Sequence, residues 1–228
     1  MNFNKIKNLS YSLWLTKKYA NLIADVPDIC KKKSIRMEYA KTLLSQLNLH
    51  IHIENSHKIP QEGQYLIFSN HRSVIDPMII DTLFDQSKIF GLWIAKKELY
   101  NSFFLGKAVR HGGCIQLDRE NQNRKIFFSE IQDTLKKGCS ICIFPEGTRN
   151  QTKQNVLPFK KGINIIASKN KLPLLPIYIQ SNASEVLNEA LHDSSIQHTI
   201  KVVIGDIIED PKKKNLETLY RDMFNLGK

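Results

Sequence analysis

The chain has 228 residues, of which 42% are hydrophobic and 24% are charged, a composition typical of a globular domain and not of a disordered chain. Lysine and arginine number 33 against 22 acidic residues, so the net charge is +11. An excess of this size favours an anionic partner, such as a lipid headgroup surface, a phosphorylated substrate or nucleic acid. No apolar run reaches the roughly 18 to 20 residues of a membrane-spanning helix, and the first residues lack the apolar core of a secretory signal.

Residues 1–48 are predicted to form an N-terminal helical segment. Its second half has apolar residues at every fourth position, the spacing of one helix face: Ile35, Tyr39, Leu43 and Leu47. Ser34 is the candidate N-cap of this helix, and Pro27 separates it from an earlier helix that carries Trp14 among leucines and lysines. A basic helix of this kind favours contact with an anionic membrane surface, although packing against the rest of the protein explains the same pattern.

The pattern changes at residue 49, where apolar and polar residues alternate as in a half-buried strand. Short apolar runs then alternate with helical patterns. We expect strands within 49–54, 65–70, 88–95, 114–118, 139–145, 172–179 and 198–206, and helices near 77–86, 122–137, 160–169 and 215–224. This order predicts an α/β domain over residues 49–228, with a mixed, largely parallel sheet flanked by helices. In such a sheet the ligand crevice lies beyond the carboxyl ends of the strands.

The four cysteines are too few for a disulfide scaffold in a chain of this length. Cys139 and Cys142 are three positions apart in an expected strand, so their side chains point to opposite faces and cannot share a metal ion. We therefore expect inert core thiols, no metal site and a reducing, cytoplasmic compartment.

Two groups of polar residues follow expected strands. In NHRSVID (70–76), His71 comes directly after a strand and Asp76 precedes Pro77, a typical helix start. A carboxylate on one imidazole nitrogen fixes the tautomer and leaves the other nitrogen free to act as a base, whereas a structural histidine and a simple N-cap explain the same residues. In FPEGTR (144–149), a glutamate and an arginine flank a glycine after a buried strand, and arginine offers a planar fork for phosphate.

Taken in order, NHRSVID (70–76), GGCIQLDR (112–119), FPEGTR (144–149) and LPIYI (175–179) resemble the motifs of the glycerolipid acyltransferase family, the 1-acylglycerol-3-phosphate acyltransferases and their relatives. The resemblance extends over about residues 35–205. It implies an O-acyltransferase of phospholipid biosynthesis that moves a fatty acyl group from acyl-CoA or acyl carrier protein to 1-acylglycerol 3-phosphate, giving phosphatidic acid.

The resemblance also implies a role for each matching residue. His71 is the expected general base and Asp76 orients it, so that the acceptor hydroxyl attacks the thioester without an acyl-enzyme; the chain has no GxSxG nucleophile motif. The expected acceptor site consists of Glu146, Gly147, Thr148 and Arg149, with Arg149 on the phosphate. Lys96 and Arg119 are the further phosphate-binding candidates.

No cofactor or metal is expected beyond the thioester co-substrate, and the expected location is the cytoplasmic face of a membrane, with peripheral or monotopic attachment. An acyltransferase for glycerol 3-phosphate or another lysolipid is the nearest alternative. A non-catalytic basic module that binds a membrane or nucleic acid is an alternative of another class. The sequence carries no recognised nucleic-acid-binding motif, so we expect no nucleic-acid partner.

Overall fold

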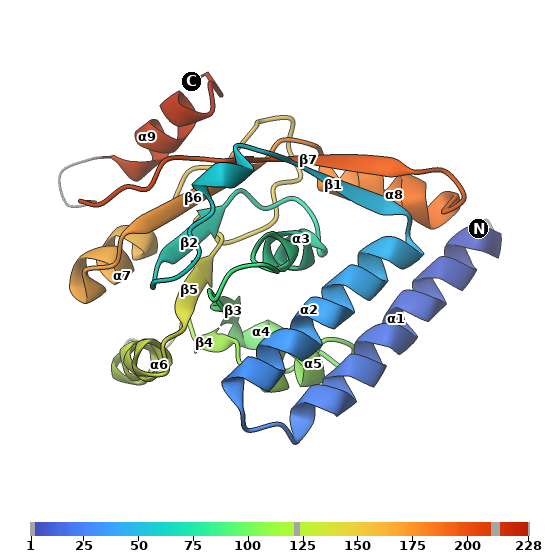
Figure 1. Ribbon diagram of the computed structural model, residues 1–228, viewed down its shortest axis with the longest axis horizontal. Helices are drawn as coiled ribbons and strands as arrows, with labels where there is room; N and C mark the ends of the chain where they lie inside the picture. The colour runs from blue at the N-terminus through green and yellow to red at the C-terminus, as the bar shows by residue number, and fades with distance from the viewer. Residues whose placement is uncertain (1–2, 121–123, 211–214, 228) are drawn as a thin grey trace.

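The computed structural model describes residues 3–120, 124–210 and 215–227. Within these residues seven strands form one sheet in the order β1-β7-β6-β2-β5-β3-β4 (Figure 1). Their bounds are β1 Leu49–Glu54, β2 Leu66–Ser69, β3 Gly91–Lys96, β4 Ile115–Leu117, β5 Ser140–Ile143, β6 Leu174–Ile179 and β7 His198–Ile204. Strands β6, β2, β5, β3 and β4 run parallel, whereas β7 pairs antiparallel with β6 and parallel with β1. The predicted mixed, largely parallel sheet is confirmed.

Helices cover both faces of this sheet (Figure 1). Residues of α1, α2, α3 and α8 share one core cluster with the strands, and residues of α6, α7 and α9 share the other. The helices are α1 Phe3–Ala24, α2 Ile29–Gln46, α3 Asp76–Leu83, α4 Lys97–Tyr100, α5 Gly106–His111, α6 Lys125–Lys136, α7 Gly162–Asn170, α8 Ala183–His192 and α9 Leu216–Met223, with a 3-10 turn η1 at Ser56–Lys58. Burial on both faces explains why the central strands are almost continuously apolar.

The two cysteines of the expected strand lie on opposite faces, as predicted. Cys142 belongs to the core cluster beneath α2 and α3, whereas Cys139 belongs to the cluster beneath α6 and α7. Both thiols are free. Burial raises the pKa of each thiol above its ordinary value, so neither is a ready thiolate.

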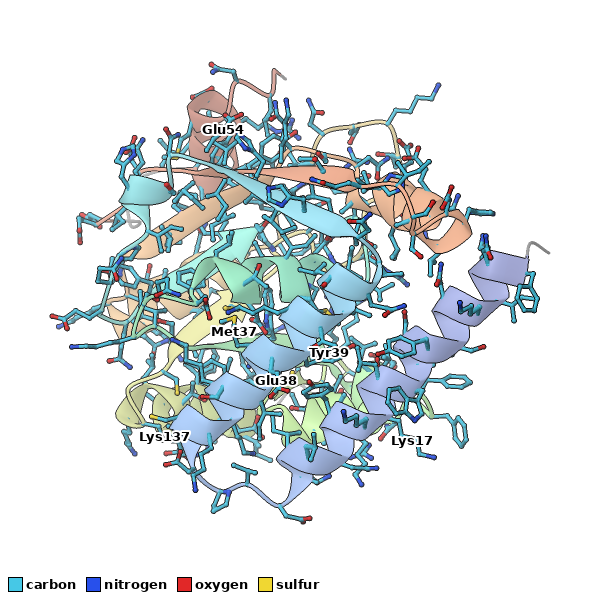
Figure 2. All side chains as sticks on the ribbon, turned by 45° about the vertical axis from the view of Figure 1, so that its right-hand side comes forward. Lys17, Met37, Glu38, Tyr39, Glu54 and Lys137 are labelled. Carbon is cyan, nitrogen blue, oxygen red and sulfur yellow. The ribbon has the colours of Figure 1, made fainter. Side chains whose placement is uncertain are left out.

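The N-terminal segment is a pair of helices that share the core of the sheet. Tyr39 and Thr16 join α2 to α1 through a 2.8 Å hydroxyl contact, and the Tyr19 hydroxyl donates to Glu38 at 2.8 Å. Tyr39 and Glu38 lie between the helices, whereas Lys17 lies on the outer side of α1 (Figure 2). The helices end at Gln46 and the first strand begins at Leu49, but the shared core makes this segment part of one packed unit.

The prediction that Ser34 caps the second helix is wrong. The helix begins at Ile29, and the Asp28 side chain accepts a hydrogen bond of 2.7 Å from the Lys31 backbone N–H. Ser34 lies one turn inside the helix, where its hydroxyl donates to the Cys30 carbonyl. The three lysines before Ser34 (residues 31–33) suggest a break between helices. Lysine is a good helix former, however, and the helix continues back through them to its N-cap, Asp28.

No helix within the described residues combines the length and the apolar character that a membrane span requires.

Candidate functional site

The expected site residues follow strands that end at the same edge of the sheet. Phe68 of β2 is in register with Ile143 of β5, and Lys96 of β3 is in register with Leu117 of β4. Because these strands are parallel, the segments after them emerge side by side. The structure therefore brings NHRSVID, Lys96, the segment after β4 and FPEGTR to one edge, as the sequence predicts.

His71 and Asp76 form the centre of this edge. The distance from His71 Nδ1 to Asp76 Oδ2 is 2.8 Å. Asp76 Oδ2 also accepts the backbone N–H groups of Arg72 and Ser73, each at 2.7 Å. Asp76 is thus the first residue of α3 rather than the N-cap, and its carboxylate turns back to close the loop that carries His71.

The contact with Asp76 fixes which imidazole nitrogen is free. An ionised carboxylate only accepts hydrogen bonds. Nδ1 of His71 therefore carries the proton and donates a hydrogen bond to Asp76. Nε2 then presents a lone pair, and among the described residues no group hydrogen-bonds it. The His71 side chain is 18% exposed and that of Asp76 is 1% exposed. The pair therefore has the arrangement of a general base oriented by a buried carboxylate.

The backbone of His71 is held on both sides. Its N–H donates to Glu146 Oε1 at 2.7 Å, and its carbonyl accepts the Asn150 N–H at 2.6 Å. The second oxygen of Glu146 accepts the Leu157 N–H at 2.9 Å. Glu146 was expected to help build the acceptor site. The structure buries its carboxylate under the loop, where it joins FPEGTR to the His71 backbone.

Burial has an electrostatic consequence for Glu146. The residue is 1% exposed, and burial raises the pKa of its carboxyl group from 4.5 to about 7. The two backbone N–H groups that it accepts favour the charged form and oppose this rise. The two amide dipoles therefore offset only part of the cost of ionising this buried carboxyl group.

Gly147 lies where two segments meet. Its φ is +69°, and a Cβ at this position would approach Nη2 of Arg119 to 2.6 Å. The Arg119 guanidinium donates to the Gly147 carbonyl at 2.8 Å. The positive φ is the feature that favours glycine here. The structure thus brings Arg119 to FPEGTR, as expected.

The other expected binding residues lie at the surface of the same edge. Thr148 and Arg149 are exposed, and Lys96 at the end of β3 is half-buried. Within the described chain, no ion pair engages Arg149 or Lys96, whereas the neighbouring Lys97 pairs with Asp118 at 2.8 Å. A lysine and an exposed arginine without ion-pair partners among the described residues are suited to bind an anionic group.

Sequence reasoning missed Asn70 and Tyr220, which tie the end of β2 to β6. The Asn70 side-chain amide donates to the Ile179 carbonyl at 3.0 Å and accepts the Ile179 N–H at 2.8 Å. The Asn70 N–H donates to the Tyr220 hydroxyl at 3.2 Å, and that hydroxyl donates to the Ile177 carbonyl at 2.8 Å. Asn70 stands inside the first motif and was within reach of sequence analysis. Tyr220 lies 150 residues away and gives no such signal.

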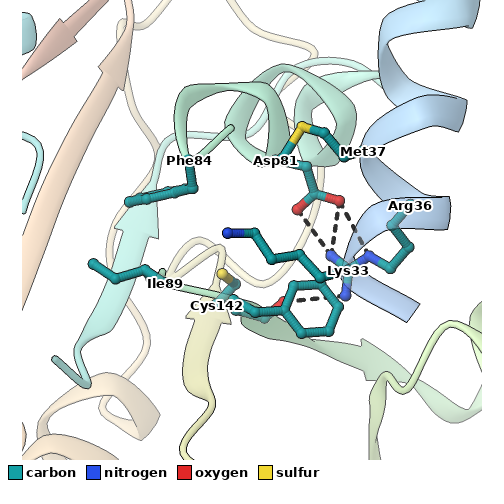
Figure 3. Close-up of a pocket in the computed structure, with 9 residues that line it drawn as sticks. Lys33, Arg36, Met37, Asp81, Phe84, Ile89 and Cys142 are labelled. Carbon is teal, nitrogen blue, oxygen red and sulfur yellow. Dashed lines mark hydrogen bonds and ion pairs between the residues drawn. The ribbon is translucent and has the colours of Figure 1, made fainter. Parts of the chain in front are cut away.

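A small cavity elsewhere in the molecule does not contain these residues. It lies between α2, α3 and the sheet, where Arg36, Asp81 and Phe84 line it (Figure 3). Its volume is about 10 Å³, which is room for about one water molecule. It is too small to hold a lipid or a thioester. Among the described residues, no group of three or more His, Cys, Asp or Glu side chains is arranged to hold a metal ion.

The fold and the site define an α/β protein with an oriented histidine at the carboxyl edge of its sheet. A sequence model of the Acyltransferase family matches residues 50–180, which include every expected site residue. The chain therefore belongs to the acyltransferase family.

Two of the curated relatives that the chain matches bear the same name. The chain is 35% identical over 127 residues to the 1-acyl-sn-glycerol-3-phosphate acyltransferase of Helicobacter pylori, a match that covers 55% of this chain and 52% of the relative. It is 29% identical over 177 residues to the enzyme of the same name from Saccharomyces cerevisiae, covering 68% of this chain and 55% of that protein. The chain spans about half the length of the curated relatives it matches.

A solved structure shares the fold. The 1-acyl-sn-glycerophosphate (LPA) acyltransferase PlsC from Thermotoga maritima superimposes with a TM-score of 0.66 at 23% sequence identity. The match covers 98% of each chain. The likeness therefore extends beyond the family match to the N-terminal helices and to the C-terminal part of this chain.

The raised pKa of Glu146 predicts a pH dependence of stability. Between about pH 4.5 and 7 the unfolded chain ionises this carboxyl group while the folded chain keeps it protonated. The free energy of unfolding should therefore fall with rising pH across this window, by at most about 1.4 kcal/mol per pH unit, and level off above it. In Glu146→Gln the fall in the free energy of unfolding that is due to this group should be absent. The variant should instead be less stable by an amount that does not change with pH, because the glutamine amide cannot accept both backbone N–H groups.

Urea unfolding of the wild type and Glu146→Gln from pH 4.5 to 8 measures this difference. Glu54→Gln, at an exposed position, is the matched control and should track the wild type. A difference between wild type and Glu146→Gln that stays constant across the window would contradict the assignment.

Proposed function

We propose that the protein transfers a fatty acyl group from an acyl thioester to the free hydroxyl of 1-acylglycerol 3-phosphate, giving phosphatidic acid. The observation that carries the proposal is the His71–Asp76 pair at the sheet edge where Arg119 and Arg149 also lie. In this pair Nε2 of His71 has no hydrogen-bond partner among the residues that the structure describes. The names of the curated relatives support the acceptor. They do not distinguish acyl-CoA from acyl carrier protein as the donor.

In the proposed mechanism, Nε2 of His71 takes the proton of the acceptor hydroxyl as that oxygen attacks the thioester carbonyl. A C–O bond forms, the C–S bond breaks, and the imidazolium returns its proton to the departing thiolate. Asp76 keeps Nδ1 protonated and stabilises the imidazolium between these steps. General-base catalysis of this kind contributes about 10²- to 10⁴-fold to the rate.

The buried thiols support direct transfer without an acyl-enzyme. Cys114 is half-buried, and burial raises the pKa of its thiol to about 11. The pKa values of Cys139 and Cys142 are also raised by burial. Because a thiolate is the reactive form, these cysteines are poor nucleophiles.

The proposed phosphate site comprises the cations at the sheet edge. Arg149 presents an exposed guanidinium, and Arg119 lies against Gly147 of the same motif. Lys96 ends the neighbouring strand and adds a point charge. A dianionic phosphate between these groups would hold the glycerol hydroxyl near His71.

Substitution of the base is the first test. Purified His71→Ala should lose at least about 10²-fold in kcat with 1-acylglycerol 3-phosphate and either thioester donor, because the hydroxyl loses its proton acceptor. His57→Ala removes an exposed histidine from the η1 turn and should keep wild-type turnover. Phosphatidic acid formed by His71→Ala at the wild-type rate would overturn the mechanism. Transfer by the wild type to glycerol 3-phosphate or another lysolipid alone would overturn the proposed acceptor.

Substitution of the exposed arginine tests the phosphate site. Arg149→Ala should raise the apparent KM for 1-acylglycerol 3-phosphate by about tenfold or more while kcat changes less. The reason is that the arginine binds the phosphate equally in the enzyme–substrate complex and in the transition state. Lys136→Ala removes an exposed cation from the far end of α6 and should leave KM unchanged. An unchanged KM in Arg149→Ala would remove this residue from the phosphate site.

We further propose that α1 and the loop between α4 and α5 rest on an anionic membrane at its cytoplasmic side, as a peripheral attachment. Apolar side chains of α1 are exposed, with Trp14 at 53%, and the loop carries Phe103 at 93% and Phe104 at 65%. Lys107 of α5 contacts Asn21 of α1 at 2.7 Å, which joins the two elements. Exposed aromatic rings beside lysines are typical of interfacial attachment.

A triple substitution tests the attachment. Trp14→Ser/Phe103→Ser/Phe104→Ser should weaken flotation with vesicles of phosphatidylglycerol and phosphatidylcholine by about tenfold or more. The variant lacks three aromatic rings that, in the wild type, move from water into the membrane on binding. Ile126→Ser/Ile196→Ser, at positions 68% and 57% exposed elsewhere on the surface, is the control and should float as the wild type does. Equal flotation of all three proteins would contradict the proposed surface.

A further inference from the structure

We propose that Phe144 and Trp93 are positioning residues that hold the plane of the His71 ring, and that the buried Arg36–Asp81 ion pair fixes Trp93 in turn. The inference rests on the proposed acyl transfer and assigns functions to residues that do not touch the substrate. It also extends the site to Arg36, which lies outside the segment that the family model matches.

The rings of His71, Phe144 and Trp93 form a continuous stack. The His71 and Phe144 ring centroids are 3.9 Å apart with an angle of 7° between the planes. Phe144 and Trp93 are 4.6 Å apart at 20°. Phe144 is half-buried and Trp93 is buried. The imidazole therefore lies on a two-ring wall that belongs to the interior of the protein.

The stack supplies a constraint that Asp76 cannot supply. The bond from Nδ1 of His71 to Asp76 fixes one point of the ring, but a single hydrogen bond tolerates tilting of the ring about that point. A parallel aromatic neighbour fixes the plane. With both constraints, the direction of the Nε2 lone pair is set before the substrate arrives, which is the condition for efficient proton transfer.

The inner ring of the stack is itself held by a charged group. Trp93 Nε1–H donates to Asp81 Oδ1 at 3.1 Å. Arg36 donates to both carboxylate oxygens of Asp81, with its two shortest contacts at 2.8 Å. Figure 3 shows this pair between α2 and α3. The bidentate geometry and the indole bond together leave the Asp81 carboxylate little freedom to move.

Arg36 connects this arrangement to the backbone of β3 and to the end of α5. Its Nη1 donates to the Gly91 carbonyl at 3.1 Å and to the Gly112 carbonyl at 3.3 Å. The guanidinium also lies over the Phe90 ring, 4.6 Å from its centroid. The Arg36 and Asp81 side chains are only 11% and 15% exposed. A buried ion pair with this many partners is suited to hold a geometry, whatever its net contribution to stability.

The proposed order of contacts is thus Arg36 to Asp81, Asp81 to Trp93, Trp93 to Phe144 and Phe144 to His71. These five residues come from α2, α3, β3 and the segments that follow β5 and β2. A change in the N-terminal helix pair can therefore reach the catalytic ring through side chains in direct contact. The expected signature is a loss of kcat with little change in the binding of the acceptor.

Three substitutions at two positions test the proposal with the whole 228-residue chain. Phe144→Leu removes the ring beneath His71 and should lower kcat by about tenfold or more, with KM for 1-acylglycerol 3-phosphate within about twofold of the wild type. Phe144→Tyr keeps the ring and should restore most of the activity. Trp93→Phe keeps a ring but removes the donor to Asp81, and should lower kcat by about three- to tenfold.

A matched control separates positioning from general destabilisation. Phe128→Leu removes a half-buried ring on α6 that packs against Phe127. It should keep kcat within about twofold of the wild type, since this ring does not contact the His71 stack. Equal losses of kcat in Phe144→Leu and Phe128→Leu, or a loss confined to KM, would overturn the proposal.

A spectroscopic readout tests the geometry independently of turnover. The carbon-bound proton at Cε1 of His71, assigned by its absence in His71→Ala, should resonate upfield because it lies over the Phe144 ring. Phe144→Leu should remove this shift, and Phe128→Leu should not. An unchanged shift in Phe144→Leu would overturn the proposed stack. An upfield shift in a wild type that acylates no acceptor would uphold the stack and overturn the proposed function instead.

Discussion

The bond between Asp76 and His71 is the interaction on which the rest of the site depends. One carboxylate oxygen accepts the imidazole Nδ1–H and two backbone N–H groups of the connecting turn. The same atom therefore closes the loop that precedes α3 and selects the tautomer of the base. Burial of Asp76 beneath the turn keeps water from competing for these bonds.

The parallel sheet explains why the remaining groups meet at this bond. Strands β2, β3, β4 and β5 end at one edge, so segments that are distant in sequence converge there. Glu146 and Asn150 hold the backbone of His71 from the segment after β5, while Arg119 approaches Gly147 from the segment after β4. The edge thus combines an oriented base with exposed cations, and the aromatic stack connects it to the helices behind the sheet.

The sequence predicted the parts of the fold that depend on local patterns. Periodicity and short motifs predict where the strands lie along the chain. They also predict the helix that includes Pro77 and the placement of His71 and Asp76 after a strand. The start of α2 was misplaced because a lysine run gives no sign of where a helix begins. The helices α4, α5 and α8 were not predicted; α4 and α5 span only a few residues, whereas α8 spans 10.

The contacts that refine the site depend on tertiary packing and were beyond sequence reasoning. Glu146 stands in a motif that suggests a surface role, and only the fold shows that its carboxylate is buried on two backbone amides. Trp93 lies in an apolar strand and gives no signal that its ring lies behind that of Phe144. Arg36 lies in a lysine-rich helix, and no sequence pattern distinguishes it from the other basic residues there.

The tautomer of His71 is the property that tests this account most directly. Nitrogen-15 NMR of the imidazole in the neutral form should show a protonated Nδ1 and an unprotonated Nε2, because the Asp76 carboxylate accepts from Nδ1. Asp76→Asn should lose this preference together with turnover. A wild-type imidazole protonated at Nε2 would contradict the account, since a base with no lone pair at its free nitrogen cannot take a proton from the acceptor.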